Sequence, residues 1–220
     1  MFTIDSDKYK VIDISHTVVP GEDVDRPFTI QKALLQDKTF RYDVLKTHSH
    51  VGTHVEVGAH FYEDGKPITD YPLEVFYGPG ILFSVKEKKV TDKTCERVIG
   101  KKIQEKDIVV IRNDTGVELS KQEVYLEGDS KLPTLTPEAA QWLAEKKVKM
   151  LVLDSIRLGE DIEKTRRFHD ILMSKDVVFV EIVDNLDKIT KARFFVMTLP
   201  YKVQGLDSSF CRAIIIEEKL

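Results

Sequence analysis

The sequence predicts an α/β fold with a mixed sheet core and flanking helices, and three observations support this prediction. Short apolar runs at residues 107–112, 148–154 and 177–181 are typical of buried central strands. Helical patterns at 136–144 and 161–174 alternate with these runs, as in βα units. The first half of the chain instead alternates apolar and polar residues, which is typical of half-exposed strands. With 220 residues, we expect one domain spanning residues 1–220.

The N-terminal half contains three stretches whose pattern predicts strands. These are residues 11–15, the two alternating segments within 28–45, which predict a hairpin, and residues 81–85, a strand that Gly78-Pro79-Gly80 opens. The segment 20–27, between the first strand and the hairpin, is rich in turn-forming and charged residues and predicts a loop.

The C-terminal half contains two helices with recognisable starts. Thr136 is a typical N-cap residue, Pro137 suits the first helical position, and Glu138 suits the positive end of the helix dipole. The second helix covers residues 161–174, and a buried strand at 177–181 follows it. Two further strands, at 194–197 and 212–216, complete the predicted sheet.

The composition excludes several classes of protein. A net charge of -4 argues against a nucleic-acid-binding protein, and 32% charged residues indicate a globular, soluble chain. The two cysteines, Cys95 and Cys211, lie far apart and suggest reduced thiols rather than a disulfide framework. The sequence contains neither a leader pattern nor an apolar run long enough to cross a membrane. We therefore expect a cytoplasmic protein that acts on a small molecule.

The most informative stretch is residues 47–61, which holds four of the six histidines. Glu56 lies among them, and Gly52 and Gly58 interrupt the run. Imidazole and carboxylate groups together are the ligands that zinc, manganese and iron prefer in proteins. The stretch therefore predicts a metal site.

The spacing of these residues predicts a bent backbone. On a straight strand, the Cα atoms of His50 and His54 would lie about 13 Å apart, too far for both rings to reach one ion comfortably. A helix would bring them together, but the β-branched residues and glycines around them disfavour a helix. A loop-like segment that hinges at Gly52, where glycine widens the choice of backbone angles, lets His50, His54 and Glu56 converge.

A second imidazole and carboxylate occur together later in the chain. His169 lies in the predicted helix, and Glu181 ends a buried strand. Active sites of α/β proteins favour strand ends. From the residues alone, a solvated role for Glu181 stays open, because glutamates at strand ends are most often exposed.

Residues 50–61, His-Val-Gly-Thr-His-Val-Glu-Val-Gly-Ala-His-Phe, resemble the H-x-G-T-H-x-D-x-P-x-H-F signature of the cyclase family of metal-dependent hydrolases. That family includes bacterial kynurenine formamidase and isatin hydrolase. Residues 169–186 and 199–213 also resemble blocks of this family, so the similarity covers nearly the whole chain. Two departures are visible: Glu56 stands where the family has aspartate, and Gly58 where it has proline. The resemblance implies a swivelling β/β/α fold.

The resemblance also implies roles for six residues. His60 would be the general acid and base and not a ligand, and this agrees with the ability of imidazole to transfer protons near neutral pH. The protein would bind two divalent ions, zinc or manganese. His50 and His54 would bind the first ion, His169 would bind the second, and Glu56 and Glu181 would bind both.

The function implied is metal-dependent hydrolysis of a small amide, either N-formyl or cyclic, by a homo-oligomer. Two alternatives stay open: a metal-dependent lyase or dehydratase acting on a small hydroxy acid, and a non-catalytic protein that binds a metal or small ligand. His60 argues against the second, because a protein that only binds metal needs no free acid and base. Formylkynurenine itself is disfavoured as substrate, because kynurenine formamidases place an aromatic residue in the loop corresponding to 20–27, whereas the only tryptophan here is Trp142.

Overall fold

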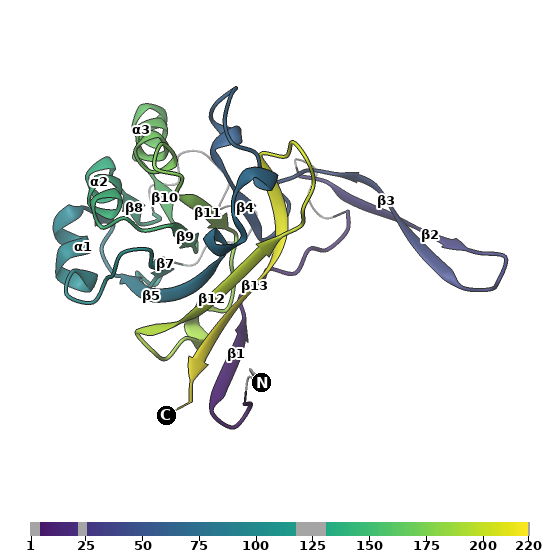
Figure 1. Ribbon diagram of the computed structural model, residues 1–220, viewed down its shortest axis with the longest axis horizontal. Helices are drawn as coiled ribbons and strands as arrows, with labels where there is room; N and C mark the ends of the chain where they lie inside the picture. Colours follow the sequence, from purple (N-terminus) through teal and green to yellow (C-terminus); the bar gives the residue numbers. More distant parts are fainter. Residues whose placement is uncertain (1–4, 22–25, 118–130, 220) are drawn as a thin grey trace.

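A computed structural model describes residues 5–21, 26–117 and 131–219, and its main feature is an eight-stranded mixed sheet (Figure 1). The strand order is β1-β13-β12-β5-β7-β9-β11-β4. The strands are β1 (Tyr9–Asp13), β4 (His54–Glu56), β5 (Tyr77–Val85), β7 (Ile108–Asn113), β9 (Met150–Leu153), β11 (Val178–Glu181), β12 (Arg193–Pro200) and β13 (Ser208–Glu218). The predicted mixed sheet is confirmed.

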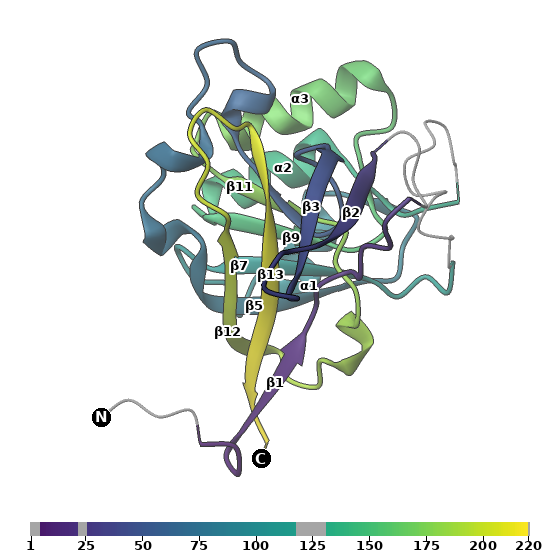
Figure 2. The ribbon, with the colours of Figure 1, turned by 90° about the vertical axis from the view of Figure 1, so that its right-hand side faces the viewer.

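Strand β13 closes this sheet into a ring. The first residues of β13 pair with β4, and the following residues pair with β12. Figure 2 shows β13 running along the body between β12 and β1. Because β4 pairs with β11 on its other side, the three-residue strand β4 lies in the closed wall and all its side chains are buried.

The four central strands β5, β7, β9 and β11 are parallel to one another. Residues 108–111, 150–153 and 178–180 are all buried, as their continuous apolar runs predict. Strand β5 begins at Tyr77 and includes Gly78-Pro79-Gly80, the residues predicted to open the strand at 81–85. The structure gives a reason: a Cβ atom added at Gly80 would lie 2.8 Å from the Phe194 ring of β12. Glycine here allows the neighbouring strand to approach.

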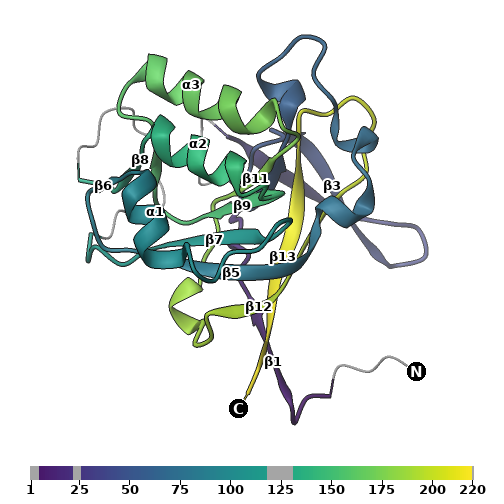
Figure 3. The ribbon, with the colours of Figure 1, turned by 60° about the vertical axis from the view of Figure 1, so that its left-hand side comes forward.

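Three helices cover one face of the parallel strands (Figure 3). They are α1 (Asp92–Ile99), α2 (Pro137–Glu145) and α3 (Ile162–Met173). The Thr136 hydroxyl accepts a hydrogen bond from the Ala139 N–H at the start of α2, and the Asp161 carboxylate accepts one from the Lys164 N–H at the start of α3. Both helices are confirmed. Helix α1 was not predicted, because it is short and no side chain caps its start.

Two hydrophobic clusters form the core, one on each face of the sheet. The first lies between the sheet and the helices and includes Phe83, Leu143 and Phe168. The second lies on the opposite face and includes Val55 and Val57 from β4. Strand β4, which carries His54 and Glu56 of the histidine motif, is therefore packed into the core.

Two smaller sheets complete the described structure. Strands β6 (Lys89–Val90), β8 (Thr134–Leu135) and β10 (Arg157–Leu158) form a three-stranded parallel sheet. Strands β2 (Phe28–Leu34) and β3 (Phe40–Thr47) form a separate antiparallel hairpin that projects from the body (Figure 1), which confirms the predicted hairpin. Residues 22–25 of the predicted loop 20–27 lie outside the described residues. None of the helices in the described part of the chain is long and apolar enough to cross a membrane.

Candidate metal centre

The histidine motif bends at Gly52, as its spacing predicts. Gly52 has a φ of +60°, in the left-handed region that favours glycine, and a Cβ atom there would collide with the Val18 side chain. After this bend, residues 54–56 form strand β4 rather than the expected loop. Because side chains alternate along a strand, His54 and Glu56 point to the same side. The bend before β4 adds His50 to that side.

The pairing of β4 brings distant parts of the chain to the motif. Across the β4–β11 pair, Glu181 lies opposite His54, and across the β4–β13 pair, Ser208 lies opposite Glu56. The Val57 N–H also donates to the carbonyl of Asp207, which precedes β13. A residue at the end of β11 and a residue at the start of β13 therefore meet at β4.

Two of the histidine rings present an Nε2 lone pair to the site. The Nδ1–H of His54 donates to the Gly52 carbonyl at 2.8 Å, and the Nδ1–H of His169, in α3, donates to the Thr165 carbonyl at 2.7 Å. Ligating histidines in metalloproteins commonly donate the other ring nitrogen to a carbonyl or carboxylate in this way. Phe61 stacks on the His169 ring with centroids 4.3 Å apart, which fixes the orientation of that ring.

The predicted ligands form two overlapping groups. Potential ligand atoms of His50, His54 and Glu56 all lie within 4.8 Å of one another, and those of Glu56, His169 and Glu181 do so as well. Glu56 belongs to both groups. The structure therefore brings together all five predicted ligands, with Glu56 between the two groups.

Two buried atoms at this centre lack a hydrogen-bond partner among the described residues. They are His54 Nε2 and Glu56 Oε1. An unsatisfied buried polar group is costly, by about 1–3 kcal/mol and more for a charged one. A cation accepts electron pairs from a neutral imidazole and a carboxylate, so it satisfies both atoms at once. The donor set and its unsatisfied atoms fit a divalent metal.

The ionisation of these groups fits the same conclusion. Burial lowers the pKa of His54 to about 4 and also lowers that of His169, so both rings are neutral at physiological pH. Burial, assisted by the nearby Glu56 carboxylate, raises the pKa of Glu181 above its ordinary value. No proton competes with a cation for the ring nitrogens of His54 and His169, and a cation relieves the repulsion between the Glu56 and Glu181 carboxylates that helps to raise the pKa of Glu181.

His60 occupies the open edge of this centre. It ends the 3₁₀ helix η1 (Gly58–His60), and its side chain is 37% exposed. Its Nε2 lies 3.7 Å from Glu56 Oε2, and its Nδ1 lies 2.8 Å from Asp207 Oδ2. The side chain is therefore near the predicted ligands yet open to solvent.

Asp207 is the residue at this centre that sequence reasoning missed. Its carboxylate contacts both His50 and His60, and although burial opposes it, these contacts hold the pKa of Asp207 well below its usual range. The only signal in the sequence was that Asp207 lies within residues 199–213, which resemble a block of the family. That resemblance did not assign a role to Asp207. Its position depends on the β4–β13 pair, which no local pattern predicts.

A cavity of about 930 Å³ opens beside the centre. His169, Glu181, Ile182 and Phe61 line the end nearest the predicted ligands. Residues 153, 154 and 156–163 line the remainder, together with Thr165 and Arg166. This volume is within the range of small-molecule sites.

Comparison with known proteins identifies the family. Residues 12–160 match the sequence profile of the family described as Putative cyclase. The chain belongs to this family. His169 and Glu181 lie beyond the matched residues, so their assignment depends on the geometry above.

Curated relatives are similar over nearly the whole chain. The kynurenine formamidase of Erythrobacter litoralis is 25% identical over 216 residues, which cover 94% of this chain and 94% of the relative. The kynurenine formamidase of Bacillus anthracis is 25% identical over 193 residues, which cover 87% of this chain and 88% of the relative. The cyclase-family chain therefore has the length of these enzymes.

Solved structures share the fold. Isatin hydrolase A from Ralstonia solanacearum superimposes with a TM-score of 0.76 at 18% identity, covering 94% of this chain and 92% of that structure. A potential metal-dependent hydrolase with cyclase activity superimposes with a TM-score of 0.71 at 20% identity, covering 96% of this chain and 100% of that structure. The predicted α/β fold is confirmed.

Proposed function

We propose that this cyclase-family protein is a metal-dependent hydrolase that cleaves a small amide, either N-formyl or cyclic. The observation that carries this proposal is the pair of buried, unsatisfied atoms, His54 Nε2 and Glu56 Oε1, beside a cavity of small-molecule size. The names of the relatives agree, because kynurenine formamidase and isatin hydrolase both denote hydrolases. As a single domain, the chain carries the whole site.

We assign the ligands of two divalent ions from the two overlapping groups. His50 and His54 would hold the first ion, His169 would hold the second, and Glu56 and Glu181 would contact both. Mixed nitrogen and oxygen donors suit zinc or manganese. Glu56 is the shared member of both groups, which supports its role as the bridge.

His60 supplies the proton transfer. A divalent cation held by these ligands lowers the pKa of water and polarises a carbonyl. Hydrolysis breaks the amide C–N bond and forms a C–O bond to water, so one proton must pass from water to the departing nitrogen. His60 is within reach of this path, because its Nε2 lies 3.7 Å from Glu56 while its ring remains open to solvent. The residue therefore accepts the proton and then donates it.

The cavity favours a small substrate with an apolar part. Its wall nearest the centre carries Phe61 and Ile182. Trp142 is not part of this wall: it lies in α2, where its Nε1–H donates to Glu96. The aromatic surface next to the ligands is therefore Phe61, and formylkynurenine is not assigned as the substrate.

The proposal is tested by removing and restoring metal. Protein stripped with a chelator is expected to lose hydrolysis of N-formyl and cyclic amides in an acyl-substrate screen, and zinc or manganese is expected to restore it. Turnover that is unaffected by stripping would contradict the metal-dependent reaction. Elimination of water from small hydroxy acids, without amide cleavage, would favour a lyase. Metal binding without turnover of either class would favour a binding protein.

The projecting hairpin carries an apolar face. In the register of β2 and β3, Ile30 faces Val44 and Leu34 faces Phe40, and between these pairs Lys32 faces Tyr42. These paired side chains share one face of the hairpin. The Lys32 ammonium lies 3.9 Å from the Phe40 ring centre, so even this cation packs on the aromatic surface. Phe40 is 60% exposed and Leu34 is 66% exposed. A two-stranded hairpin with such a face is marginal in water on its own.

We propose that the apolar face of this hairpin packs against a second copy of the chain, so that the protein is a homo-oligomer. The body of each copy offers apolar side chains for such a contact, because β12 exposes Phe195 and Leu199 and β1 exposes Val11. Contacts between identical chains are the commonest way in which soluble proteins cover such surfaces.

Changing the apolar face of the hairpin is expected to dissociate the oligomer. In sedimentation analysis, wild-type protein should have a mass above that of one chain, and Phe40→Glu with Val44→Glu should shift it to the mass of one chain. The matched control, Gln31→Glu with Ala33→Glu, adds the same two charges on the opposite face of the same hairpin and should leave the mass unchanged. A wild-type protein that sediments as a monomer at high concentration would contradict the proposal.

A further inference from the structure

Asp207 contacts the two histidines that have different proposed roles. Its Oδ2 lies 2.8 Å from His60 Nδ1 and 3.0 Å from His50 Nε2. Its Oδ1 accepts a hydrogen bond from the Ser49 hydroxyl at 3.1 Å. One carboxylate therefore holds a predicted metal ligand and the predicted proton-transfer residue.

The backbone fixes this carboxylate firmly. The Asp207 carbonyl accepts the Val57 N–H, and the next residue, Ser208, pairs with Glu56 across β4 and β13. The preceding residue is also held, because the Leu206 carbonyl accepts the Ile68 N–H. The position of Asp207 is thus set by the same strand pairing that closes the sheet around the centre.

A carboxylate beside a neutral imidazole determines which ring nitrogen carries the hydrogen. A carboxylate only accepts hydrogen bonds, so the Nδ1 of His60 must be the donor and its Nε2 keeps the lone pair. That Nε2 points to the Glu56 side of the centre, 3.7 Å from Oε2. In the same way, Nε2 of His50 donates to Asp207 and leaves Nδ1, which lies 3.3 Å from Glu56 Oε2, free to bind metal.

We infer that Asp207 is a positioning residue that sets the tautomer of both His60 and His50. As a result, His60 presents its basic Nε2 to the centre, and His50 presents its ligand nitrogen Nδ1 to the same centre. This inference rests on the proposed function for the role of His60, but the tautomer itself does not depend on that function. Asp207 keeps its own charge throughout, and the transferred proton passes through His60 Nε2 only.

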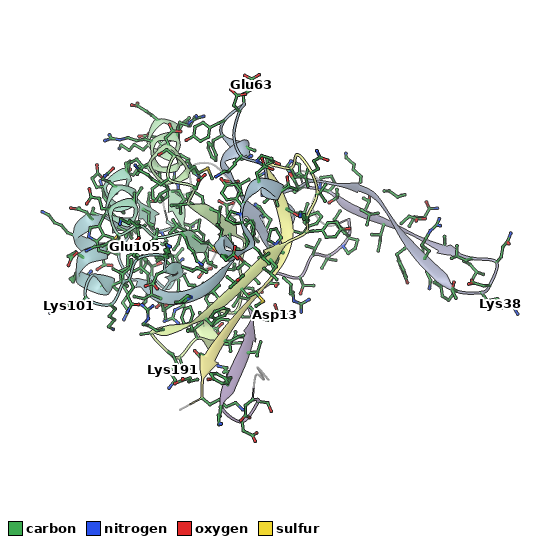
Figure 4. The ribbon with its side chains drawn as sticks, viewed as in Figure 1. Asp13, Lys38, Glu63, Lys101, Glu105 and Lys191 are labelled. Atoms are coloured by element: carbon green, nitrogen blue, oxygen red, sulfur yellow. The ribbon has the colours of Figure 1, made fainter. Side chains whose placement is uncertain are left out.

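Kinetics and metal affinity provide the first test, using Asp207→Asn. The amide can donate to His60 Nδ1 and so favour the opposite tautomer, which should lower kcat by about 10²–10⁴-fold with little change in KM. Loss of the acceptor for His50 should weaken metal binding by about 10–100-fold, measured by metal titration. Asp207→Glu retains the carboxylate and should recover part of both losses. The control Asp64→Asn makes the same chemical change in the exposed loop next to Glu63 (Figure 4) and should alter neither.

The second test reads the tautomer without any turnover. Side-chain ¹⁵N–¹H spectra of the zinc-loaded protein are recorded at alkaline pH, where imidazole is neutral, and His60 is assigned by comparison with His60→Gln. Wild-type protein should show hydrogen on Nδ1 of His60, and Asp207→Asn should move it to Nε2. An unchanged tautomer together with unchanged kcat and metal affinity would overturn the inference. If wild-type protein hydrolyses no amide, the proposed function fails, but these spectra still decide the role of Asp207. If Asp207→Asn does not fold, Asp207→Ala, which also removes the carboxylate, is used for the same comparison.

Discussion

Replacing His60 with alanine is expected to lower kcat by about 10²–10⁴-fold and to leave the metal content at the wild-type level. The reason is the position of the ring, which lies at the solvent-exposed edge of the centre and contacts Asp207 rather than completing either of the two groups that contain Glu56. Steady-state kinetics and elemental analysis of the same protein sample measure the two effects together.

A matched control is available in the same segment. His48 is exposed and lies just before the bend. Its ring accepts a hydrogen bond from the His50 backbone N–H, but it belongs to neither group of predicted ligands, so His48→Ala removes an imidazole without removing a proposed ligand. It should keep both activity and metal. If His60→Ala loses its metal along with its activity, His60 is a ligand, and the nearby group of His50, His60 and Asp207 would be the alternative site.

The double variant His50→Ala, His54→Ala is expected to lose the first ion and all measurable amide hydrolysis. The two side chains supply both of the imidazoles in the first group, and His54 is fully buried with an unsatisfied Nε2. Without them only carboxylates remain at that position, and these bind zinc poorly compared with a mixed donor set. Elemental analysis and the amide assay measure the outcome.

Folding must be monitored in this variant because β4 is part of the closed sheet. The unfolding temperatures of the metal-free wild type and the metal-free double variant are compared. Equal temperatures would show that the substitutions remove the metal without disturbing the packing of β4. The control His169→Ala should remove the second ion and spare the first. Metal retained at wild-type stoichiometry in the folded double variant would show that His50 and His54 do not hold the first ion.

Much of the fold was predictable because its strongest signals are local. The apolar residues of β7, β9 and β11 are all buried, and the caps Thr136 and Asp161 mark the starts of α2 and α3. Closure of the sheet was not predictable. It depends on β13 pairing with β4, a contact between residues more than 150 positions apart in the chain. The alternation of apolar and polar residues along the chain does not indicate which distant strands will pair.

The candidate site was predictable to a similar degree. His50, His54, Glu56 and His60 lie in one short motif, and their spacing together with Gly52 predicted the bend. His169 and Glu181 were placed only by their resemblance to family blocks, because nothing local distinguishes a strand-end glutamate from a solvated one. Asp207 was missed for the same physical reason as the closure, since its role arises only after β13 reaches β4.

We hypothesise that the two departures from the family signature, at Glu56 and Gly58, compensate for each other. Glu56 is longer than the aspartate of the family, and Gly58 replaces a proline that would fix the backbone. The Gly58 N–H lies 3.5 Å from the Tyr71 hydroxyl, a contact that proline could not make. Exchanging Gly58 for proline would therefore remove this contact, which is local and independent of the metal.

The central claim is that Glu56 links two metal ions held by residues from β4, α3 and β11. The most direct measurement is elemental analysis of wild-type protein purified without chelator and then supplied with zinc or manganese, beside Glu56→Ala treated in the same way. The account predicts two tightly held ions per chain in the wild type and a loss of metal in the variant. A wild type that holds no ion, or a variant whose stoichiometry is unchanged, would contradict it.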